Sequence, residues 1–200
     1  MVVIIDYKAG NLYNVAHALK YLGKEFNFSS DPAVVRRASK VILPGVGSAR
    51  PAMESLGEQN LIEALQQLDA PFLGICLGMQ LLFEGSEEEQ TPCLGIIPGT
   101  VKKFDNAQVK VPHIGWNQVR QMAVDGTPNA IFRGLPEDGF FYFVHSFYVP
   151  QSTPGALAVT DYSVPFVSAV QKDNFWGVQF HTERSGEFGL RLLRNFLEAT

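Results

Sequence analysis

Short strand-like runs alternate with helix-like segments through the first half of this chain, and this alternation limits the possible folds more than any other feature. We predict strands over 2–6, 25–30, 40–45 and 71–76. Apolar residues recur at helical spacing in 11–23, 31–39, the stretch that runs from residue 46 to 68, and 77–86. Strands that alternate with helices predict a mostly parallel sheet that is covered by helices on both faces.

Local signals set the ends of the first two predicted helices. Asn11 stands where a capping side chain belongs, and Gly23 ends the same pattern. Asp31 and Pro32 suit the capping and first helical positions of the second helix. We therefore expect helices that begin directly after Asn11 and Asp31.

The pattern changes from about residue 95, where strand-like segments follow one another with few helices between them. A turn over 171–176 predicts a hairpin, and the last helix, over 188–199, is amphipathic. The strand-like segments are 95–104, 109–119, 141–149, 156–162, 164–171 and 175–181. We expect residues 1–200 to form one α/β domain: an open, mostly parallel sheet flanked by helices, with an antiparallel extension in its second half.

The charge and cysteine content exclude several classes of protein. The net charge is −4 and no basic tract is present, which disfavours nucleic-acid binding. No apolar run approaches the roughly 20 residues that span a bilayer, and the first ten residues do not resemble a signal peptide. Two cysteines in different settings, Cys76 and Cys93, do not form a disulfide framework. We expect a reduced cytoplasmic protein without a membrane partner, and Cys93 is expected to be a bystander.

Cys76 lies between two glycines where a predicted strand gives way to a helix. Buried cysteine is often only a small core residue, so packing is one interpretation. The other is a nucleophile on a sharp strand-to-helix turn, in which Gly74 and Gly78 leave room for the turn. The start of the helix would favour the thiolate, and the Leu77 N–H could stabilise an oxyanion. Gln80, one helical turn later, could face the same cleft.

His181 and Glu183 could complete a catalytic set with Cys76. In an extended chain they point to the same side, about 6–7 Å apart along the backbone. A carboxylate there would orient the imidazole and stabilise its charged form. The alternative is a buried histidine that a carboxylate merely satisfies. Cys76 and His181 both end predicted strands, which favours the catalytic interpretation.

A glycine-rich segment, "LPGVGSAR" over 43–50, follows another predicted strand. It lacks the Lys-Ser/Thr pair of a phosphate loop and the spacing of a dinucleotide fingerprint, so no nucleotide cofactor is expected. Ligands of open α/β sheets bind beyond the carboxyl ends of the strands, so this segment should neighbour Cys76. Gly47 and its preceding peptide could supply a second backbone donor opposite Leu77.

Several of these segments resemble a known family. "GICLGMQ" (74–80) and "VQFHTE" (178–183) resemble the class I, or triad, glutamine amidotransferases, which use Cys–His–Glu and have a flavodoxin-like architecture. The likeness runs almost from end to end. More narrowly, four segments are similar to the glutaminase subunits of imidazole glycerol phosphate synthases: "DYKAGN" (6–11), "LPGVGSA" (43–49), "VPHIGWN" (111–117) and "SGEFGLRLLRNFL" (185–197).

The resemblance implies a role for each matching residue. Cys76 would attack the carboxamide of L-glutamine, with the oxyanion held by the N–H groups of Leu77 and Gly47. His181 would protonate the departing ammonia and then activate water, while Glu183 orients it. The substrate would be held by Gln80 and by the backbone of His145, Ser146 and Phe147. No metal or cofactor is implied.

The resemblance also implies a partner, a (β/α)8-barrel cyclase subunit that forms a heterodimer with this chain and receives its ammonia. The products would be imidazole glycerol phosphate, for histidine synthesis, and an aminoimidazole carboxamide ribotide. In the family the "PGVG" peptide rests with its donor turned away until the partner is ready. Candidate contacts are Asn11, Asn14, His113 and Trp116, although core packing for Trp116 and a structural hydrogen bond for His113 remain open.

One position departs from the family pattern, and three other functions remain open. Thr182 stands where the family often has proline, which performs no chemistry, so catalysis should survive. The acidic run "SEEEQ" (86–90) is expected to be a solvated loop. The alternatives are a cysteine peptidase, a silent interaction subunit, and a glutaminase subunit of another synthase, such as pyridoxal-phosphate or anthranilate synthase.

Overall fold

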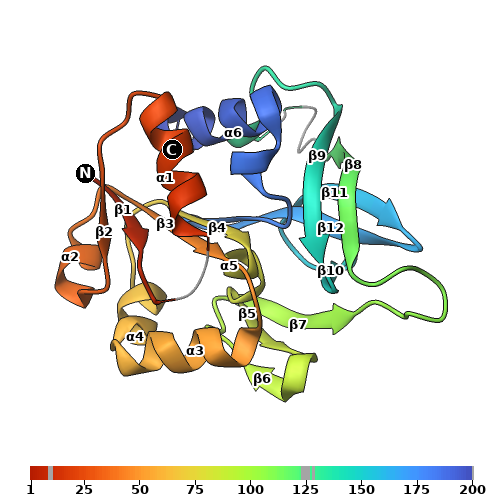
Figure 1. The fold of residues 1–200 in the computed structure, drawn as a ribbon, viewed down its shortest axis with the longest axis horizontal. Coiled ribbons are helices and arrows are strands. Elements are labelled where there is room, and N and C mark those ends of the chain that lie inside the picture. Colours follow the sequence, from red (N-terminus) through yellow and green to blue (C-terminus); the bar gives the residue numbers. More distant parts are fainter. Residues whose placement is uncertain (9–10, 123–126, 128, 200) are drawn as a thin grey trace.

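A parallel five-stranded core forms the centre of the molecule (Figure 1). The computed structural model describes residues 1–8, 11–122, 127 and 129–199, so residues 9 and 10 of the "DYKAGN" segment lie outside it. The core strands are parallel and stand in the order β2-β1-β3-β4-β13, the order of flavodoxin-like sheets. Their bounds are β1 Val2–Ile5, β2 Phe26–Ser29, β3 Lys40–Gly45, β4 Phe72–Cys76 and β13 Phe175–Val178.

Helices cover both faces of this core, as the alternation of strands and helices predicts (Figure 1). Successive strand residues point to opposite faces. Ile4, Ile42 and Leu73 pack in the cluster that includes residues of α1 and α6, whereas Val3 and Val41 pack in the cluster that includes residues of α2, α3 and α4. The helices are α1 Leu12–Tyr21, α2 Pro32–Arg36, α3 Ala49–Glu58, α4 Leu61–Gln66 and α6 Gly186–Ala199.

Eight further strands, most of them in the second half of the chain, extend the same sheet, mainly by antiparallel pairing. Of the described residues, thirteen strands belong to this sheet. The predicted hairpin joins β12 to β13, and the side chain of Asn174 in its turn donates to the carbonyls of Leu68 and Ala70. The added strands are β5 Phe83–Ser86, β6 Thr91–Pro92, β7 Ile97–Lys103, β8 His113–Gln121, β9 Asp138–His145, β10 Phe147–Pro150, β11 Ala156–Tyr162 and β12 Val164–Lys172. The expected fold class is therefore confirmed.

Three local predictions were wrong. The helix expected over 77–86 is only one turn long, α5 Leu77–Gln80, because Phe83 leaves it to pair with Ile97 in β7. The side chain of Asn11 makes no capping hydrogen bond, since its ψ of 58° lies outside the extended region that caps adopt. The strand expected over 175–181 ends at Val178, and the N–H of His181 bonds to Tyr142 of β9 instead.

In the part of the chain that the structure describes, no helix combines the length and the apolar character needed to cross a membrane. The expected cytoplasmic location remains a prediction.

Candidate active site

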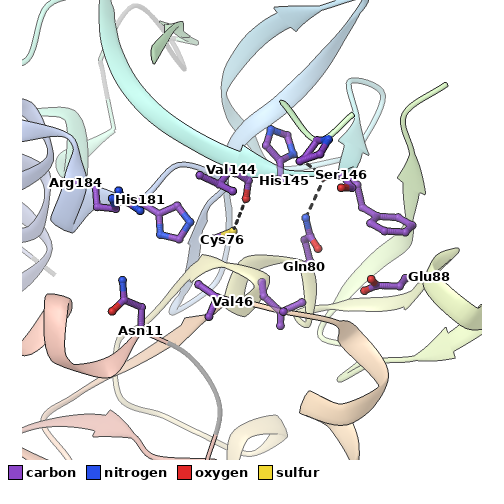
Figure 2. A pocket seen from close by; sticks show the side chains of 14 residues that line it. Asn11, Val46, Cys76, Gln80, Glu88, Val144, His145, Ser146, His181 and Arg184 are labelled. Carbon is purple, nitrogen blue, oxygen red and sulfur yellow. Dashed lines mark hydrogen bonds between the residues drawn. The ribbon is translucent and has the colours of Figure 1, made fainter. Parts of the chain in front are cut away.

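The carboxyl ends of β3 and β4 lie side by side, because Gly45 pairs with Cys76 in the parallel ladder. This contact brings the "PGVG" segment next to Cys76, as the sequence predicts. A cavity of about 290 Å³ opens there. It lies between the ends of these strands and the β9–β10 segment, with His181 and Asn11 at its side (Figure 2). Cys76 is therefore positioned where ligands bind in open α/β sheets.

Cys76 is the residue at which the chain turns from strand to helix. Its φ of 54° and ψ of −109° place a non-glycine residue in a strained region. A Cβ on Gly74 would lie 2.5 Å from the carbonyl oxygen of Gly78, and a Cβ on Gly78 would lie 1.9 Å from that of Leu43. The turn therefore requires both glycines. Since α5 is a single turn, the dipole at the sulfur is that of one turn rather than of a longer helix.

His181 and Glu183 are in contact, although the chain between them is not extended. Thr182–Arg184 forms a 3-10 turn, and His181 Nδ1 lies 2.9 Å from Glu183 Oε1. Thr182, which differs from the family proline, is fully buried at the start of this turn. The ring of His181 is directed toward Cys76 (Figure 2). A turn, rather than the extended chain that the sequence predicts, therefore brings His181 and Glu183 into contact.

The charge state of His181 follows from these neighbours. Burial lowers the pKa of His181, but hydrogen bonds and charge interactions with Cys76 and Glu183 outweigh this effect and raise the pKa from 6.5 to about 10. The second oxygen of Glu183, Oε2, is buried and has no hydrogen-bond partner among the described residues. His181 is thus held as an imidazolium beside the sulfur at neutral pH.

The raised pKa of His181 predicts a pH-dependent contribution to stability. A group whose pKa is raised on folding stabilises the protein fully below its unfolded value and loses this effect as the pH rises through its folded value. The free energy of unfolding of the wild type should therefore exceed that of His181→Gln most at pH 6 and fall toward the variant's value between pH 6.5 and 10. Urea unfolding of both proteins across this range measures the difference. A difference that grew with pH would contradict the assigned charge state.

Two backbone segments lie where oxyanion donors are expected. Leu77 and Gly47 both line the cavity beside Cys76. Gly47 has a φ of +96°, which side-chain-bearing residues rarely adopt, and a Cβ there would meet no atom within 4 Å. Backbone conformation rather than space therefore favours glycine at this position. Their role as donors remains a prediction.

The structure brings the expected glutamine-holding residues to the same cavity. Gln80 lines it together with His145, Ser146 and Phe147. The amide nitrogen of Gln80 donates to the carbonyl of Phe147 at 3.0 Å, a bond drawn in Figure 2. The sulfur of Cys76 lies 3.6 Å from the carbonyl oxygen of Val144, so the thiol can donate to it.

Of the four expected partner contacts, Trp116 is exposed, His113 is buried, and the two asparagines line cavities. Trp116 is 56% exposed on β8, so the packing interpretation was wrong. His113 is only 4% exposed and bonds to His145, so its side chain is not a surface contact. The structural hydrogen bond that the sequence left open for His113 is the arrangement observed, because His113 faces the inside of the sheet extension. Asn11 lines the active-site cavity. Asn14 lines a second cavity, which Glu183 also lines.

Sequence reasoning missed three residues that lie in the cavity or behind it. Glu88 lines the cavity and accepts from the backbone N–H of Ala49 at 2.7 Å, so the solvated-loop prediction was wrong for this residue. Arg184 lines the cavity and lies over the ring of Tyr142, 4.7 Å from its centroid. Gln179 is buried against Cys76. Only Gln179 had a sequence signal, as a polar residue within an apolar run.

No group of three or more potential metal-ligating side chains that could hold an ion occurs among the described residues.

Comparison with known proteins gives consistent matches over nearly the whole chain. Residues 3–200 match the family model described as glutamine amidotransferase class-I. The chain is 48% identical to imidazole glycerol phosphate synthase subunit HisH of Yersinia pseudotuberculosis over 98% of both chains. It is 48% identical to the subunit of the same name from Bacteroides fragilis and 46% identical to that of Escherichia coli, again over 98% of each chain.

Solved structures with low sequence identity share the fold. A crystal structure of a glutamine amidotransferase matches with a TM-score of 0.75 and 20% identity, over 99% of this chain and 98% of the other. The PurLQS structure from Thermotoga maritima matches with a TM-score of 0.73 and 18% identity, over 99% and 97% of the two chains.

Proposed function

The chain belongs to the class I glutamine amidotransferase family, and on that premise we propose that it is the glutaminase subunit of an imidazole glycerol phosphate synthase. The observation that carries this proposal is the likeness to three such subunits at 46–48% identity over nearly the full length. Residues 1–200 would act as one glutaminase domain. The reaction converts L-glutamine and water to glutamate and ammonia for histidine biosynthesis.

The chemistry proposed for the cavity uses the thiol as nucleophile. With the thiol proton already on His181, the charged sulfur of Cys76 attacks the side-chain carbonyl carbon of glutamine. The N–H groups of Leu77 and Gly47 stabilise the oxyanion that forms. His181 then protonates the departing nitrogen, and ammonia leaves behind a γ-glutamyl thioester. His181 next takes a proton from water, which attacks the thioester, and glutamate is released with the charged sulfur and the imidazolium restored. Glu183 orients His181 throughout.

The lining of the cavity supports glutamine as its substrate. Glu88 is the one carboxylate among the described residues that line this cavity, and it suits the α-ammonium group of an amino acid. Gln80 and the backbone of 145–147 would hold the rest of the substrate. The volume of about 290 Å³ is small for an extended peptide, which argues against the peptidase alternative.

We propose that a (β/α)8-barrel cyclase subunit accepts the ammonia. Ile114, Trp116 and Phe140 are exposed apolar residues of β8 and β9, and such a cluster is typical of a protein interface. The barrel would use the ammonia on a phosphoribulosyl-formimino aminoimidazole carboxamide ribotide. Its products would be imidazole glycerol phosphate and an aminoimidazole carboxamide ribotide. The "PGVG" peptide would complete the oxyanion hole only when this partner is bound.

Ammonia release from glutamine tests this proposal. We expect a low rate for the chain alone and strong stimulation by the barrel subunit with its nucleotide substrate. Trp116→Ala should raise the barrel concentration for half-maximal stimulation at least about 10-fold, because exposed tryptophans dominate the binding energy of many interfaces. Phe28→Ala, an exposed aromatic on β2 away from β8, is the matched control. A high rate without any partner, or equal effects of the two variants, would argue against partner-gated activity at this face.

A further inference from the structure

Gln179 is a polar residue in an apolar part of the core, directly behind the catalytic sulfur. It is 0% exposed, and Val178 and Phe180 on either side of it are fully buried. It does not line the cavity, so it would not touch a substrate there. Its Nε2 atom lies 3.7 Å from Cys76 Sγ, and its Oε1 atom accepts from Gln80 Nε2 at 2.9 Å. Both the nitrogen and the oxygen of this buried amide therefore have a hydrogen-bond partner next to the nucleophile.

The orientation of this amide is determined by Gln80. The Nε2 group of Gln80 donates one hydrogen to the carbonyl of Phe147 and the other to Gln179. Rotating the Gln179 amide by half a turn would place two NH2 groups against each other. Gln179 therefore presents its oxygen to Gln80 and its N–H to the sulfur.

A pair of buried histidines fixes the carbonyl that holds Gln80. His145 Nδ1 lies 2.7 Å from the carbonyl oxygen of Phe147, which can only accept, so Nδ1 is the protonated nitrogen. His145 Nε2 must then accept from His113 Nδ1 at 2.9 Å, and His113 Nε2 accepts from Asn117 Nδ2 at 3.3 Å. Burial lowers the pKa of His145 to about 3 and that of His113 to about 4, so both rings are neutral. Every hydrogen bond from Asn117 to Phe147 therefore has a defined direction.

We propose that Gln179 is a further catalytic residue whose buried amide N–H donates to the Cys76 sulfur, with Gln80, His145 and His113 as the positioning residues that aim it. The inference rests on the proposed role of Cys76 as nucleophile. With the thiol proton on His181, the sulfur is a charged acceptor, while Gln179 neither gains nor loses a proton. A donor that is already aimed at a buried charge stabilises it without reorganisation. The competing interpretation is that Gln179 only packs in the core and has no effect on the sulfur.

Thiol alkylation separates these two interpretations without any glutaminase assay. Cys93→Ser leaves Cys76 as the single thiol of the chain, which has two cysteines in all. In this background Gln179→Met removes the donor at similar length. Gln171→Met makes the same change on the neighbouring strand β12, where the amide bonds to Asn129 and Asp173. The titratable groups around the sulfur, His181 with Glu183 and Tyr7, are present in both variants.

We expect Gln179→Met to slow iodoacetamide alkylation of Cys76 about 10-fold at pH 7 and to move its pH dependence upward by about one unit. Gln171→Met should alkylate like the parent. In the complex with the barrel subunit, Gln179→Met should lower kcat about 10-fold with little change in KM, because the residue acts on the nucleophile rather than on bound glutamine.

Equal alkylation of the two variants, or a raised KM with unchanged kcat, would overturn the inference while leaving Cys76-dependent ammonia release intact. If Gln179→Met does not fold, the side-chain amide protons of Gln179 can be observed by NMR in the unaltered full chain. Their signals should shift between the wild type and Cys76→Ala. Identical signals in these two proteins would equally exclude a bond from Gln179 to the sulfur.

Discussion

Cys76→Ser is expected to lower glutaminase turnover at least about 1,000-fold, since a hydroxyl is a far weaker nucleophile than a thiolate and the site is arranged around sulfur. The substitution is nearly isosteric, and Cys76 is only 5% exposed in a turn whose shape depends on Gly74 and Gly78. Glutamine binding and assembly with the barrel subunit should therefore change little. Ammonia release by the complex gives the turnover, and glutamine titration of the variant gives the binding.

Cys93→Ser is the matched control for this experiment. Cys93 is a partly buried residue next to α3 rather than in the cavity, and burial together with the charge of Glu88 raises the pKa of its thiol to about 11. Its replacement should leave turnover unchanged. Wild-type turnover in Cys76→Ser, or a large loss in Cys93→Ser, would mean that the nucleophile has been assigned to the wrong residue.

Gly78→Ala is expected to cause the second large effect, a loss of about 3 kcal/mol or more in the free energy of unfolding. The added Cβ would lie 1.9 Å from the carbonyl oxygen of Leu43, which belongs to a central strand. Neither β3 nor the turn after Cys76 can move away without breaking the ladder that joins Gly45 to Cys76. Urea or guanidinium unfolding at neutral pH measures the loss, and turnover should fall with it.

Gly57→Ala in helix α3 is the control for the same chemical change. A Cβ there would meet only Ile62 Cδ1, at an ordinary 3.6 Å. Alanine is favoured over glycine in a helix, so this variant should be stabilised by roughly 0.5–1 kcal/mol. Similar stabilities for the two alanine variants would show that the turn does not pack against β3 as described.

The sequence predicted the architecture well where the signals are local. The strands β1, β3 and β4 lie within one residue of their expected bounds, because β-branched runs act over neighbouring residues. The helix after Asp31 begins where the Asp–Pro pair predicts, but it ends at Arg36 rather than at residue 39. The helix expected over 77–86 failed for the opposite reason. Pairing of Phe83 with Ile97 is a contact between distant segments, and it overrides the helical spacing of the leucines.

The residues of the site could also be predicted where their sequence signals are local, and not where they depend on contacts between distant segments. The glycines beside Cys76 and the spacing of His181 and Glu183 are local patterns, and the structure brings these side chains together. Glu88 was missed because only the folding of its loop toward Ala49 turns one acid of an acidic run into the cavity. The role of His113 was left open between a partner contact and a structural hydrogen bond, because the sequence of a strand shows its two faces but not which of them is covered.

Trapping the covalent intermediate would show whether Cys76 is the nucleophile. The complex with its barrel partner is mixed with glutamine, quenched in acid during turnover, digested and analysed by mass spectrometry. We expect a glutamyl group on the peptide that carries Cys76, and none in His181→Gln. Steady ammonia release with no modification of Cys76, or with the glutamyl group on Cys93, would exclude Cys76 as the nucleophile.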